Sequence, residues 1–168
     1  MLRLPQLDSS RKCGPCTACC TALGVEELNK PRGVICKHIC NGCAIYATRP
    51  ESCRTYYCAW RVGFGLPEDR PDKIGVVCTY VTSKSVGRRV LEILELWEGA
   101  ADEPRPSALI KQAAATQIVF IQGNKTRKPF TIIPQYEAGK IKLEILNNME
   151  AALKDQLPGF MPGSTTEK

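Results

Sequence analysis

Cysteine is the residue type whose spacing in this chain is best suited to chemistry. Four thiols fall within eight residues, in the segment Cys13-Gly14-Pro15-Cys16-Thr17-Ala18-Cys19-Cys20. Nine of the ten cysteines lie in residues 13–58, and only Cys78 lies outside that range. Thiolates are soft ligands that suit zinc and iron–sulfur clusters. The pattern therefore predicts a cysteine-ligated metal module.

The cellular compartment decides whether such thiols bind metal or form disulfides. Residues 1–8 have no apolar stretch followed by a small-residue cleavage site, so we expect no secretory signal. No segment approaches the roughly 18 apolar residues of a membrane-spanning helix. We therefore expect a cytoplasmic chain with no membrane partner, in which reductants keep thiols unpaired and available to metal. A disulfide scaffold exported by another route is the alternative.

The first cysteine group indicates more than one metal ion. A Gly-Pro pair between Cys13 and Cys16 suits a tight turn in which two sulfurs converge. No helix breaker follows until residue 24, and a helical turn would place Cys16 on one face with Cys19 and Cys20. Adjacent side chains on a helix diverge by about 100°. Cys19 and Cys20 should therefore serve different ions, or one sulfur should bridge.

The second group holds Cys36, Cys40, Cys43 and the single histidine, His38. An Asn-Gly turn before Cys43 would bring it back toward Cys36 or Cys40. We expect Cys40 to stay free or to support the site, with a redox role or a role as a substitute ligand as the alternative. His38 is interpreted as a structural residue, with an occasional ligand or a donor to sulfur as alternatives.

The third group places Cys53 and Cys58 five residues apart, after a proline that suits the first position of a short helix. Arg49 and Arg54 are interpreted as offsetting thiolate charge, and the alternative is an anionic substrate. Four aromatic side chains are interpreted as a hydrophobic shell around the metal: Tyr46, Tyr56, Tyr57 and Trp60.

The three groups together resemble the YkgJ-type cysteine-cluster family, the zinc- or iron-chelating CxxCxxCC domain. The resemblance covers residues 13–60 and is carried by four elements: the first cluster quoted above, Cys36-Lys37-His38, Cys43-Ala44-Ile45-Tyr46-Ala47-Thr48-Arg49-Pro50-Glu51-Ser52-Cys53-Arg54, and Tyr56-Tyr57-Cys58-Ala59-Trp60. It implies eight metal ligands: Cys13, Cys16, Cys19, Cys20, Cys36, Cys43, Cys53 and Cys58. The flagellin lysine methylases, which resemble this family, are associated with an iron–sulfur cluster and methyl transfer.

Eight thiolates would satisfy two tetrahedral zinc sites, or an iron–sulfur cluster with one zinc ion. We expect a metal-binding protein with a structural or metal-handling role; the alternative is an iron–sulfur-dependent enzyme of methyl or electron transfer. Residues 1–73 hold eleven Lys and Arg and seven Asp and Glu, a net +4. Eight thiolates with two divalent ions would bring this part near zero. The basic excess therefore compensates for the site, and metal ions rather than nucleic acid are the expected partners.

The sequence patterns outside the cysteine groups predict both strands and helices, and therefore an α+β protein. We expect a cysteine-cluster module over residues 1–73 and an α+β part over 74–168 packed on it, with a Gly- and Pro-rich seam at 61–73. Strands are expected at Ile74–Val81, with Cys78 as a small buried hydrophobe, and at Arg89–Glu98, Gln117–Gln122 and Phe130–Pro134. Helices are expected at Pro104–Thr116 and from Ile141 to about Leu157. Large core side chains are expected at Trp97, Phe120 and Phe130.

Overall fold

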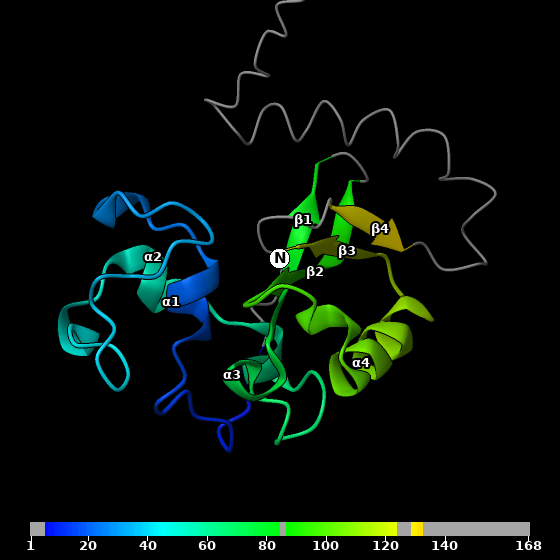
Figure 1. Ribbon diagram of the computed structural model, residues 1–168, viewed down its shortest axis with the longest axis horizontal. Coiled ribbons are helices and arrows are strands. Elements are labelled where there is room, and N and C mark those ends of the chain that lie inside the picture. Colours follow the sequence, from blue (N-terminus) through cyan, green and yellow to red (C-terminus); the bar gives the residue numbers. More distant parts are fainter. Residues whose placement is uncertain (1–5, 85–86, 124–128, 133–168) are drawn as a thin grey trace, which may run out of the picture.

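The computed structural model describes residues 6–84, 87–123 and 129–132, and it shows an α+β protein. A four-stranded mixed sheet has helix α4 (Pro104–Ala114) on one face and helix α1 (Ala18–Ala22) on the other. Figure 1 shows α1 with the other cysteine-rich segments (blue to cyan) on the opposite side of the strands from α4. The predicted α+β class is thereby confirmed.

The sheet follows the sequence order β1-β2-β3-β4. Its strands are β1 (Val76–Ser83), β2 (Arg88–Glu95), β3 (Val119–Gln122) and β4 (Phe130–Ile132). β2 and β3 are parallel, and the other two pairs are antiparallel. Parallel neighbours need a long crossover, which α4 supplies. The four predicted strands and the helix at 104–116 are therefore present.

The remaining helices are short. They are α2 (Glu51–Thr55) and α3 (Pro71–Ile74), with single 3-10 turns at η1 (Glu26–Leu28), η2 (Tyr46–Thr48), η3 (Ala59–Val62) and η4 (Ala100–Asp102). No helix in the described part of the chain is both long and apolar enough to cross a lipid bilayer. The helix expected from Ile141 to Leu157 lies outside the described residues.

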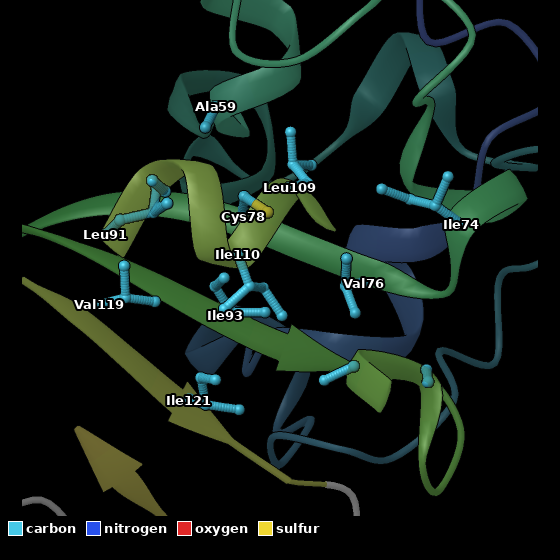
Figure 2. Packing of buried hydrophobic residues seen from close by; sticks show 13 residues of the cluster. Ala59, Ile74, Val76, Cys78, Leu91, Ile93, Leu109, Ile110, Val119 and Ile121 are labelled. Carbon is cyan, nitrogen blue, oxygen red and sulfur yellow. The ribbon is translucent and has the colours of Figure 1, made fainter. Parts of the chain in front are cut away.

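The main core lies between the sheet and α4. Leu109, Ile110 and Ala113 of α4 pack on alternate residues of the strands, and Leu91 and Ile93 of β2 are fully buried. Figure 2 shows Cys78 among Leu109, Ile110 and Ile93. Cys78 is thus the small buried hydrophobe that the sequence predicts, and burial raises its thiol pKa to about 12. A thiol with so high a pKa is a poor nucleophile at neutral pH.

Two of the side chains expected in the core, those of Trp97 and Phe120, are not fully buried. Trp97 is 41% exposed, because the chain has already left β2, and its indole N–H donates to the Glu103 carboxylate over 2.8 Å. The prediction that Trp97 enters the core is therefore wrong. Phe120 is half-buried, and the side chain of Phe130 lies outside the described structure.

Gly75, which ends α3, is expected to tolerate no side chain. Its φ is +75°, and a Cβ there would lie 2.3 Å from the Trp97 ring. Gly75→Ala should lower the free energy of unfolding by more than about 1 kcal/mol, since it combines left-handed strain with displacement of the ring. Gly87→Ala, at φ +65° in open space, reports the strain alone. Urea denaturation measures both; equal losses would show that the ring contact contributes nothing.

The second face of the sheet carries the cysteine-rich segments. Ala18 and Ala22 of α1 pack with Cys58 and Trp60 on Val77 and Leu94 of the strands. Two polar contacts support this packing. Arg32 forms an ion pair with the buried Glu92 of β2 at 3.1 Å, and Tyr56 shares a hydrogen bond with Thr79 of β1.

Candidate metal centre

A cavity of about 70 Å³ lies between α1, α2 and the loops that connect them. Seven of the eight cysteines proposed as ligands line it: Cys13, Cys16, Cys19, Cys20, Cys36, Cys43 and Cys53. The eighth, Cys58, is buried in the cluster that packs α1 on the sheet. Cys40 is exposed, and neither Cys40 nor His38 is among the residues described as lining the cavity. The structure therefore gathers thiols that lie up to 40 residues apart in sequence.

The first cysteine group forms a tight turn followed by a helix. The backbone N–H of Cys16 donates to the Cys13 carbonyl over 2.9 Å, and Gly14 has a φ of +52°. The helix begins at Ala18, because Thr17 at φ −115° and ψ 14° is not helical. Cys16 therefore precedes the helix, whereas the sequence analysis placed it in the helical turn with Cys19.

The second group is joined to the first by backbone. Cys36 N–H donates to the carbonyl of Cys20 over 3.0 Å. Asn41 and Gly42 have φ values of +45° and +123°, so the predicted turn is present and pairs Cys43 with Ile39. The turn leaves the side chain of Cys40 in solvent, and Cys43 alone returns to the cavity.

The third group is positioned by a carboxylate from an earlier loop. Glu27 of η1 accepts hydrogen bonds from the Ser52 N–H over 3.1 Å and from the Ser52 hydroxyl over 2.7 Å. These contacts hold the start of α2, which carries Cys53, against the loop that follows α1. Pro50 precedes the first helical residue, one position before its expected place.

Arg11 is a positioning residue that sequence reasoning did not identify. Its guanidinium is buried and donates to the carbonyls of Trp60, Phe64 and Gly65 over 2.8–3.0 Å. Asp8 pairs with its Nε at 3.1 Å. These bonds hold the segment before Cys13 against the segment after Cys58. In the sequence, Arg11 lies in a polar N-terminal segment, and nothing there distinguishes it from an arginine whose side chain is exposed to solvent.

Burial opposes bare thiolates at several of these cysteines. It raises the pKa of Cys16 to about 11, and it also raises the pKa values of Cys53 and Cys58. Donors nonetheless point at the sulfurs: the Ala18 N–H lowers the pKa of Cys16, and N–H groups of Arg61 and Trp60 lower that of Cys58. Such buried thiols become thiolates only beside a positive partner, and a coordinating metal ion deprotonates thiols outright.

Cys19 and Cys20 have opposite titration behaviour. The Cys19 thiol donates a hydrogen bond to Cys20, which lowers the pKa of Cys20 to about 6 and raises the pKa of Cys19. The charges of Lys30 and Arg49 further lower the pKa of Cys20. The interpretation of Arg49 as a charge offset fits this contact, since it lines the cavity; Arg54 is exposed and is not among the lining residues.

The expected aromatic shell is only partly present. Tyr46 and Tyr56 line the cavity, and the Arg49 guanidinium stacks on the Tyr46 ring at 3.8 Å. Trp60 is buried beside Cys58 in the cluster under α1. Tyr57 is 45% exposed and does not belong to the described lining, so its inclusion in the shell is wrong.

The donor set fits a thiolate-bound metal in chemistry and in size. Among the described residues that line the cavity, sulfur is the abundant ligand atom, and none carries a carboxylate or an imidazole. The volume of about 70 Å³ is room for roughly five water molecules. Within residues 6–84, 87–123 and 129–132, no three His, Cys, Asp or Glu side chains are arranged to hold a metal ion. The thiols thus surround a space rather than converge on one point.

Comparisons of the chain with protein-family models, with curated proteins and with solved structures give no significant match. A metal centre is therefore supported by the residues themselves. Its main support is that three cysteine groups, separate in sequence, face one small cavity.

Proposed function

We propose that this is a metal-binding protein of the YkgJ type, in which eight cysteines hold zinc or iron as more than one ion or as a cluster. The centre organises the N-terminal half or takes part in metal handling. The observation that supports this most directly is the lining of one cavity by seven thiols from three sequence groups.

The size and lining of the cavity favour a metal-holding role over a substrate pocket. Pockets for organic ligands measure roughly 300–1,000 Å³, far more than the approximately 70 Å³ between these thiols. Aliphatic side chains, among them Leu23, Leu28 and Ile45, form much of the remaining lining. Such a site keeps water and larger molecules from bound thiolates, as structural metal sites do.

Metal content and colour test the proposal. The protein, purified without oxygen, should carry thiolate-bound metal that elemental analysis counts, at about two ions per chain for two Cys₄ zinc sites. A colourless zinc protein supports the structural role. A brown protein with iron and acid-labile sulfide favours the iron–sulfur enzyme alternative. A chain that carries no metal and takes up none after reduction contradicts the proposal.

Two serine variants provide a matched comparison. Cys53→Ser, at the cavity, should lower the metal content by about one ion per chain, because serine replaces a soft ligand by a poor one. Cys40→Ser, in the exposed turn, should keep the wild-type content. Elemental analysis of both proteins after gel filtration measures the difference. Equal metal contents in the two variants would exclude Cys53 as a ligand.

A further inference from the structure

The adjacent Cys19 and Cys20 face different surroundings because of the way α1 packs. Ala18 and Ala22 form the face of α1 that is buried on the sheet. At about 100° per residue, Cys19 lies about 80° from the centre of that face and Cys20 about 180° from it. Cys19 is therefore the thiol nearer the sheet and Cys20 the thiol farther from it, although the two side chains are hydrogen-bonded to each other.

The thiols on the sheet side form one neighbourhood. Cys58 is buried in the same cluster as Ala18 and Ala22, and Cys16 packs against that cluster. Cys13 is brought there by Arg11, which binds the carbonyl of Trp60 two residues after Cys58.

The thiols on the outer side form a second neighbourhood. Cys36 is joined to Cys20 by the 3.0 Å backbone hydrogen bond. Cys53 is held nearby through the contact of Ser52 with Glu27, and Cys20 and Cys36 both act electrostatically on it. Cys43 lines the cavity from the loop that begins at Cys36.

We infer that the cysteines form two separate four-thiolate sites with no shared sulfur. One site comprises Cys13, Cys16, Cys19 and Cys58; the other comprises Cys20, Cys36, Cys43 and Cys53. This assignment rests on the proposed metal-binding function and extends it, because it states which thiols bind each ion. The second site is nested in sequence within the first, and the peptide bond between Cys19 and Cys20 joins them.

Cadmium NMR of the wild-type chain tests this assignment directly. The spin-active cadmium isotope prefers tetrahedral thiolate ligands, as zinc does, and couples to the β-protons of each cysteine that binds it. We expect two cadmium resonances without mutual coupling, each correlated with the four cysteines of one site. Correlation of any cysteine with both ions would show a bridging sulfur and overturn the inference. So would correlation of Cys19 and Cys20 with the same ion, or of Cys40 with either.

The same experiment separates this inference from the proposed function. A reduced chain that binds no cadmium contradicts metal binding itself, whereas two bound ions with mixed ligand sets contradict only the assignment. Paired variants add a second measurement. Cys13→Ser/Cys58→Ser, within one site, should keep one ion per chain, and Cys53→Ser/Cys58→Ser, across the sites, should keep none. Equal numbers of bound ions in the two variants would overturn the assignment.

Discussion

Removal of the metal ions should unfold the cysteine-rich half of the protein and lower the melting temperature of the whole chain. The helices α1 and α2 have five residues each, and helices this short are not stable alone in water. The cluster that packs α1 on the sheet consists of a few small side chains around Trp60. In zinc-finger peptides, metal binding contributes about 10–16 kcal/mol to folding. Loss of the ions should therefore lower the stability of the protein more than any single substitution does.

Trp60 is a natural reporter of this transition. It is buried beside Cys58, and its indole N–H donates to the carbonyls of Leu66 and Pro67. The other tryptophan is the exposed Trp97, so a Trp97→Phe variant leaves Trp60 as the single emitter. A strong chelator should shift the Trp60 emission to longer wavelength, and added zinc should restore it. Unchanged emission and melting temperature after complete metal loss would show that the half folds without metal.

Loss of the Arg105 side chain should destabilise the protein by about 2–3 kcal/mol, because it leaves the carboxylate of Asp69 buried without its cation. Asp69 is only 2% exposed. Its carboxylate accepts a hydrogen bond from the Leu66 N–H over 2.7 Å and pairs with Arg105, whose Nε lies 2.6 Å from Oδ1. Urea denaturation of Arg105→Ala measures the loss.

The double variant Asp69→Ala/Arg105→Ala identifies the cause. Without the carboxylate no buried charge is left unpaired, so the double variant should be more stable than Arg105→Ala alone. If the double variant is less stable than Arg105→Ala, the unpaired carboxylate of Asp69 is not the cause of the destabilisation.

The same ion pair should produce a dependence of stability on pH. The hydrogen bonds from Arg105, the largest effect, hold the pKa of Asp69 below its usual value. The contribution of the pair is therefore complete above the unfolded pKa of about 3.9 and is lost as pH falls through the lower folded pKa. The difference in unfolding free energy between wild type and Arg105→Ala should shrink as the pH is lowered below about 4. A constant difference would contradict this account.

The local elements of this protein could be predicted from its sequence alone. Alternating and β-branched residues predicted β1, and the apolar positions Leu109, Ile110 and Ala113 predicted the buried face of α4. The Asn-Gly pair before Cys43 predicted its turn. These features depend on residues close in sequence, where side-chain periodicity and turn preferences act directly. The spacing of the cysteines also predicts a metal module, and this stays a prediction.

Only the tertiary structure decided which cysteines lie near one another. The sequence predicts only that the side chains of Cys19 and Cys20 diverge; the burial of Ala18 and Ala22 with Cys58 on the sheet decides which side of α1 is nearer to the sheet. Arg11 acts as a positioning residue only because the fold brings the carbonyl of Trp60, 49 residues later in the sequence, within hydrogen-bond distance of its guanidinium. Trp97 was expected in the core and is exposed, since the strand ends two residues before it. These outcomes depend on contacts between distant segments, which local patterns do not encode.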